Sequence, residues 1–65
     1  MKNKFSENLK NLRMEANLSQ KDIADKLNVS FKTISHWESG YSEPCIEVLL
    51  QLKEILGATY EDLFE

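Results

Sequence analysis

The sequence has few residues that make crosslinks or break helices. Its 65 residues include one cysteine, one proline and two glycines. The lone Cys45 has no partner for an internal disulfide, and nothing resembles a zinc ligand set. The scarcity of proline and glycine predicts few loops. A domain this small must therefore depend on a well-packed core, which self-association can supplement.

Long apolar runs are also lacking. No run approaches the roughly 18 residues that suggest a membrane span, and the start, MKNKFSENLKNLR, has no apolar region of a secretory signal. We therefore expect a cytoplasmic protein with no membrane association. The sequence also lacks a carboxylate pair, a nucleophile constellation and a glycine-rich phosphate loop, so we expect neither an enzyme nor a metal, cofactor or small-molecule site.

Basic residues are scarce in the second part of the chain. Residues 41–65 hold one lysine and six acidic residues, whereas residues 1–40 hold seven basic and five acidic residues, a balance of +2. The net charge of −3 argues against a non-specific polyanion binder but leaves room for a local basic face on the first part. The composition, 42% hydrophobic and 29% charged, predicts one folded domain over residues 1–65.

The residue pattern predicts five helices and no strand. The first helix has an apolar face of Phe5, Leu9, Leu12 and Ala16, and Asn17 ends it.

The second helix begins at Ser19, which forms an approximate capping box with Asp22. It ends at Asn28, where a left-handed turn residue fits. Its apolar stripe consists of Ile23, Ala24 and Leu27.

Ser30 is a good N-cap for the third helix, which runs to Ser39 before Gly40. The three residues between the second and third helices force a sharp crossing, which predicts a helix-turn-helix over about residues 19–39.

The fourth helix has a wide apolar surface and ends at Gly57, and Thr59 with Asp62 starts a short fifth helix. The apolar residues of the fifth helix exceed what one short helix needs to dock. We therefore expect a homodimer through the fourth and fifth helices, with an interface of Leu56, Tyr60, Leu63 and Phe64.

The third helix, residues 31–39, divides into two faces on a helical wheel. Thr33, Ile34, Trp37 and Glu38 form a face typical of a core. The opposite face carries a mixed set of donors, acceptors and one aromatic ring with a single formal charge: Phe31, Lys32, Ser35, His36 and Ser39.

The stretch LSQKDIADKLNVSFKTISHWESG resembles the helix-turn-helix of the phage-repressor and Cro-like family, often called the XRE family. The resemblance extends to the C-terminal helices and covers nearly the whole chain. It implies an all-α, compact five-helix, lambda-repressor-like DNA-binding domain. The matching residues are Leu18-Ser19-Gln20, Ile23-Ala24, Leu27, Val29-Ser30, Thr33-Ile34-Ser35, Trp37-Glu38, Gly40, Pro44 and Leu63-Phe64.

The resemblance implies a sequence-specific transcriptional regulator, a repressor, whose partner is a double-stranded DNA operator. Helix 31–39 would lie in the major groove, with Phe31, Lys32, Ser35 and His36 at the positions that contact base edges.

Other positions that match the family are implied to contact phosphates, which set register rather than sequence preference. These positions are Gln20, Thr33, Ser39 and Tyr41. Arg13 and Glu38 match a pair that forms an internal ion pair in some members, and the helical wheel independently places Glu38 on the buried side.

Two departures from the family pattern bear on affinity and chemistry. The loop after Gly40 carries Glu43, which would repel a nearby phosphate, where many relatives have a basic residue. Cys45 takes the place of a serine or aspartate cap, and we interpret it as a buried, inert cap residue rather than a redox sensor. The alternative function is a protein-interaction module, antitoxin-like or a co-regulator partner, with weak DNA affinity.

Overall fold

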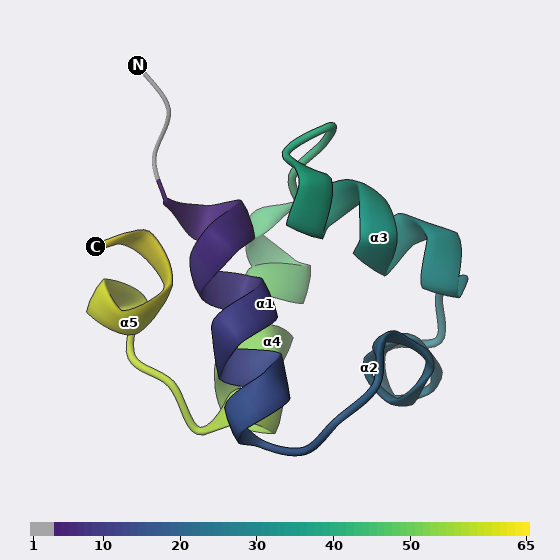
Figure 1. Ribbon diagram of the computed structural model, residues 1–65, viewed down its shortest axis with the longest axis horizontal. Coiled ribbons are helices and arrows are strands. Elements are labelled where there is room, and N and C mark those ends of the chain that lie inside the picture. The colour runs from purple at the N-terminus through teal and green to yellow at the C-terminus, as the bar shows by residue number, and fades with distance from the viewer. Residues whose placement is uncertain (1–3) are drawn as a thin grey trace.

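The computed structural model describes residues 4–65, which form five helices and no strand. The helices are α1 (Phe5–Glu15), α2 (Gln20–Leu27), α3 (Phe31–Ser39), α4 (Ile46–Leu56) and α5 (Tyr60–Phe64). The predicted all-α class is confirmed. α1 stands at the centre with α4 behind it, while α2 and α3 lie on one side of α1 and α5 on the other (Figure 1). The helix-turn-helix and the last helix therefore occupy opposite sides of the molecule.

Side-chain caps start the helices where the sequence predicted them. Ser19 and Thr59 each form a complete capping box, with Asp22 and Asp62 respectively. Ser30 Oγ accepts a hydrogen bond from the backbone N–H of Thr33 at 3.4 Å and caps α3. These hydroxyls satisfy backbone donors that the first helical turn leaves without an intrahelical partner.

Left-handed residues end the first four helices. An N–H two residues past the last helical turn can then bond back to an earlier carbonyl and close the helix end. At the end of α3, the backbone N–H of Tyr41 donates to the carbonyl oxygen of His36 at 2.9 Å. The residues with positive φ are Asn17 (59°), Asn28 (60°), Gly40 (82°) and Gly57 (61°). The expected turn at Asn28 is confirmed.

The core lies where α1, α2, α3 and α4 meet, and α5 closes it. α3 packs against α1 and α2, and α4 packs against α2. This packing buries one face of α3 through Ile34 and Trp37 and leaves its other face toward solvent. The buried core residues are Phe5, Leu9, Ile23, Ala24, Leu27, Ile34, Trp37, Leu49, Leu52 and Leu63.

The expected dimer interface is wrong at Leu63, whose side chain is fully buried. α5 docks on α1, where Asn8 Nδ2 donates to the Leu63 carbonyl at 3.1 Å. Phe64 is half-buried because its ring stacks on that of Phe5 at a centroid distance of 5.3 Å. The fifth helix thus uses these two residues to close the core.

Two residues that the sequence led us to expect in buried positions, Ala16 and Cys45, are exposed. Ala16 is exposed because α1 ends at Glu15 and Ala16 begins the turn that leaves the helix, so it does not extend the apolar face. Cys45 is an exposed free thiol, not a buried one, because it precedes α4 in an extended segment. Its side chain makes no capping hydrogen bond.

Candidate nucleic-acid interface

The start of α2 is fixed by the capping box. Asp22 Oδ2 accepts from the Ser19 N–H at 2.8 Å, and Ser19 Oγ accepts from the Asp22 N–H at 3.0 Å. Hydrogen bonds from the backbone and side chain of Ser19 lower the pKa of Asp22 from 3.8, so the carboxyl is ionised at neutral pH. The N–H groups of Gln20 and Lys21 precede the first intrahelical donor and point out of the helix end, which favours an anion there.

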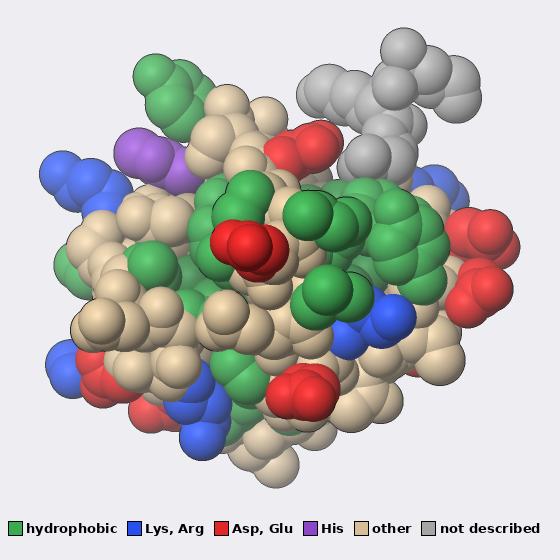
Figure 2. All heavy atoms as spheres, turned by 180° about the vertical axis from the view of Figure 1, so that it is seen from behind, with side chains coloured by type: hydrophobic (Ala, Val, Ile, Leu, Met, Phe, Trp, Pro, Cys, Tyr) green, Lys and Arg blue, Asp and Glu red, His purple; other side chains and the backbone are tan. Residues whose placement is uncertain are grey.

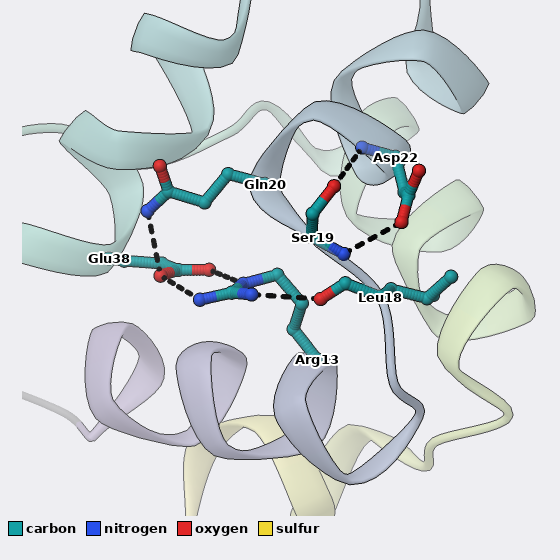
Figure 3. A network of polar contacts seen from close by, with 6 residues as sticks. All are labelled: Arg13, Leu18, Ser19, Gln20, Asp22 and Glu38. Carbon is teal, nitrogen blue, oxygen red and sulfur yellow. Dashed lines mark hydrogen bonds and ion pairs between the residues drawn. The ribbon is translucent and has the colours of Figure 1, made fainter.

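A polar network ties α1, α2 and α3 together (Figure 3). Arg13 Nε lies 2.6 Å from Glu38 Oε2, and Arg13 Nη2 donates to Glu38 Oε1 at 3.2 Å. Arg13 Nη1 also donates to the Leu18 carbonyl at 2.8 Å, and Gln20 Nε2 donates to Glu38 Oε1 at 3.1 Å. The Arg13 and Glu38 side chains are only 12% and 4% exposed. The network therefore holds the two helices of the helix-turn-helix against α1 from within the fold.

Gln20 is half-buried and makes an inward contact that its sequence position did not reveal. One amide hydrogen is used by Glu38, and the amide oxygen points away from that carboxylate (Figure 3). A primary amide has a second N–H. That N–H and the backbone N–H are the groups that remain for a phosphate.

The four residues expected to contact bases share the outer face of α3. Phe31, which is 59% exposed, and Lys32 lie in the first turn and are directed to solvent. Ser35 and His36 follow one turn later and are half-buried. Their spacing of four residues places them above the first pair on one helical face.

The two α3 hydroxyls expected at the DNA backbone are used locally. Thr33 Oγ1 lies 3.2 Å from Ser30 Oγ, within the N-cap of α3. Ser39 Oγ donates to the carbonyl oxygen of His36 at 3.1 Å. With its hydrogen committed, the Ser39 hydroxyl presents only lone pairs outward, which a phosphate oxygen does not bind.

Tyr41 makes a contact that sequence reasoning missed. Its side chain is 79% exposed, and its ring lies 4.8 Å from the His36 ring, centroid to centroid, with a tilt of 49°. The sequence feature that could have predicted this contact is Gly40. Its left-handed conformation folds the chain back, so that the next residue lies over the last turn of α3.

Metal-ligand groups and membrane-spanning helices are both lacking from the described part of the chain. Residues 4–65 contain no group of three or more His, Cys, Asp or Glu side chains arranged for a metal ion. None of their helices is both long enough and apolar enough to cross a bilayer.

A short-linked helix pair with a fixed crossing and a mixed polar outer face defines a helix-turn-helix DNA-binding domain. Comparisons with known proteins support the same class of domain. The chain matches the sequence model of the family described as Helix-turn-helix over residues 9–63.

Individual relatives are regulators from bacteria and an archaeon. The chain is 39% identical over 59 residues to the HTH-type transcriptional activator BcrR of Enterococcus faecalis, covering 91% of this chain and 29% of BcrR. It is 39% identical over 64 residues to MJ0272 of Methanocaldococcus jannaschii, described as an uncharacterized HTH-type transcriptional regulator, covering 98% of this chain and 91% of MJ0272. The crystal structure of a transcriptional regulator from Listeria innocua matches with a TM-score of 0.88 and 33% identity, covering 98% of this chain and 60% of the other.

The chain therefore belongs to the Cro/C1-type (XRE) helix-turn-helix family of DNA-binding domains. This is a family of transcriptional regulators rather than enzymes. The chain spans less than a third of BcrR and about half of two other curated relatives, 53% of YqaE of Bacillus subtilis and 48% of DdrOP3 of Deinococcus deserti.

Proposed function

We propose that this chain is a sequence-specific, double-stranded DNA-binding transcriptional regulator that represses by occupying its operator in the cytoplasm. The observation that carries the proposal is the outer face of α3. Its side chains are varied donors, an acceptor and an apolar ring, and α3 is held rigidly by the Arg13–Glu38–Gln20 network. A major groove distinguishes all four base pairs by donors, acceptors and the thymine methyl, so such a face suits base recognition better than charge alone.

Four of the outer residues of α3 have a chemical role in this proposal. Lys32 donates to guanine O6 and N7, and Phe31 contacts a thymine methyl. Ser35 and His36 hydrogen-bond base edges from the second turn. The α2 N-terminus with Gln20 binds a phosphate and sets the register.

The test is selection from a random duplex pool at low salt, followed by sequencing of the retained DNA. Enrichment of a defined sequence supports the proposal, and a palindrome with half-sites about one helical turn, roughly 34 Å, apart indicates a dimer. A single enriched half-site indicates that a monomer binds. If the folded protein enriches nothing, the protein-interaction module is the better interpretation.

The sign of regulation needs a separate experiment because one relative, BcrR, is named an activator. A reporter gene placed behind the selected operator is expected to be expressed less when the protein is supplied. Higher expression would contradict repression without contradicting DNA binding.

We further propose that the protein is a homodimer joined through α4 and α5. Three apolar side chains there are largely exposed, namely Ile46 (62%), Leu50 (55%) and Tyr60 (51%). Figure 2 shows hydrophobic side chains gathered over these two helices. α5 lies across α1 from the helix-turn-helix, so a second copy bound at this face leaves both α3 helices free for DNA (Figure 1).

Leu50→Glu is expected to convert the dimer to a monomer, because it places a charge on the exposed apolar face where a partner would desolvate it. Sedimentation velocity at micromolar concentration measures this change. Met14→Glu is the matched control, since Met14 is equally exposed (56%) but lies on α1. Equal sedimentation of the wild type and both variants would exclude this interface.

A further inference from the structure

The contact between Tyr41 and His36 assigns a role to a residue outside the helix-turn-helix. His36 is the only histidine of the chain and stands on the DNA-facing side of α3. The neighbouring Tyr41 ring, 4.8 Å away, is the ring contact that the structure gives to this imidazole. This contact places an exposed aromatic ring beside one of the side chains proposed to contact bases.

The backbone after α3 holds Tyr41 in place. Four donors converge on the carbonyl oxygen of His36: the N–H of Gly40, the N–H of Tyr41 at 2.9 Å, the N–H of Ser42 at 3.4 Å and Ser39 Oγ at 3.1 Å. Gly40 adopts a φ of +82°, a conformation that glycine enters without steric cost. The backbone of Tyr41 is thus bound to the backbone of His36, and the rings of the same two residues are in contact.

A fixed neighbour restricts the orientations of the imidazole before DNA arrives. A half-buried histidine on a helix surface still has several rotamers to choose from, and binding to a base edge costs the entropy of selecting one. A ring packed against one side removes part of that cost. The saved entropy strengthens binding only where His36 makes a directional contact to a base. Tyr41 therefore raises sequence discrimination rather than general affinity.

We propose that Tyr41 is a positioning residue that fixes the His36 imidazole for base recognition and so sets the preference at the base pair that His36 contacts. The proposal rests on the proposed DNA-binding function. It differs from the phosphate contact that the family resemblance implies for Tyr41, because here the Tyr41 ring acts on His36 and not on the DNA backbone.

The first experiment needs no DNA. The His36 ring protons are expected to show an aromatic ring-current shift in NMR spectra of the wild type. Tyr41→Phe keeps the ring and is expected to keep the shift, whereas Tyr41→Ala is expected to lose it. Identical His36 shifts in Tyr41→Ala and the wild type would overturn the proposal whatever the function of the protein.

The second experiment measures dissociation constants for the selected operator and for each single-base variant of it. Tyr41→Ala is expected to lose about three- to ten-fold in discrimination, the scale set by ordering one side chain. The loss is expected only at the base pair where His36→Ala also loses discrimination. Tyr41→Phe is expected to keep the discrimination, whatever the hydroxyl contributes to affinity. In the His36→Ala background, Tyr41→Ala is expected to cause no further loss.

Several results would contradict the positioning role. If Tyr41→Ala weakens every sequence equally, also in the His36→Ala background, Tyr41 contacts the DNA backbone. If Tyr41→Phe loses as much discrimination as Tyr41→Ala, the hydroxyl is responsible. If His36→Ala changes discrimination at no base pair while the operator is still bound, the proposal fails and the proposed function stands. Absence of any selected operator is instead a failure of the proposed function.

Discussion

Replacing Arg13 with methionine is expected to lower the free energy of unfolding by about 3–5 kcal/mol, the cost of leaving a buried charge without its partner. The Glu38 side chain is 4% exposed, and Arg13 supplies both charged hydrogen bonds to it. Of the residues that the structure describes, Gln20 alone would then still donate to that carboxylate. Domains of this size have a total stability of about 3–10 kcal/mol, so the variant should be largely unfolded near 37 °C. Urea denaturation followed by circular dichroism measures the loss.

Two control variants test whether the loss of stability comes from leaving the buried Glu38 charge without a partner or from losing any ion pair. Lys21 and Asp25 form an exposed pair at 3.2 Å, with side chains 78% and 68% exposed, and Lys21→Met should change stability by less than about 1 kcal/mol. The double variant Arg13→Met, Glu38→Leu should recover much of the loss, because removing both charges leaves neither unpaired. A small effect of Arg13→Met alone would show that Glu38 is solvated in solution and that the network does not hold α3.

Lys32→Ala is expected to weaken binding to the selected operator about ten- to hundred-fold, while binding to random duplex changes by less than about three-fold. Loss of one bidentate contact to guanine removes about 1–3 kcal/mol of discrimination. His36→Ala is expected to act in the same direction. Lys32 is exposed in the first turn of α3, so the substitution should leave the fold intact. Fluorescence anisotropy at several salt concentrations measures both affinities.

The salt dependence identifies the kind of contact that Lys32 makes. A base contact leaves the slope of log K against log salt nearly unchanged, whereas loss of a phosphate contact reduces the slope by about one. Gln20→Ala is the comparison for the two affinities, since a lost phosphate contact weakens operator and random duplex alike. Its neutral amide displaces no counterion, so Gln20→Ala is expected to leave the salt slope unchanged. Equal losses on both DNAs for Lys32→Ala would contradict its assignment to a base.

The hydrogen bond from Gln20 to Glu38 links the polar network to the proposed phosphate contact. The same Glu38 carboxylate that stabilises the fold also orients the amide proposed to bind a phosphate. If Gln20 binds a phosphate as proposed, stability and register on DNA are coupled through one side chain. Gln20 is part of the fold as well as of the proposed interface, which its sequence position alone did not indicate.

Local features of this protein were predictable from the sequence because they depend on residues three to five positions apart. The capping boxes at Ser19 and Thr59, the left-handed Asn28 and the closing Gly40 all follow from backbone hydrogen bonding within one turn. The two faces of α3 follow equally from helical periodicity, which separates Ile34 and Trp37 from the outer residues. These features were enough to predict the fold class and the surface that we propose contacts DNA.

Contacts between distant segments were decided only by the tertiary structure. Periodicity shows that Leu63 and Phe64 are apolar, but not whether α1 or a second copy covers them, and the docking of α5 on α1 buries the first and half-buries the second. The same holds for the inward amide of Gln20 and for the Tyr41 ring against His36. A helix face or a turn carries no information on its partner until the helices pack, because the free energy that selects the partner comes from surface buried between them.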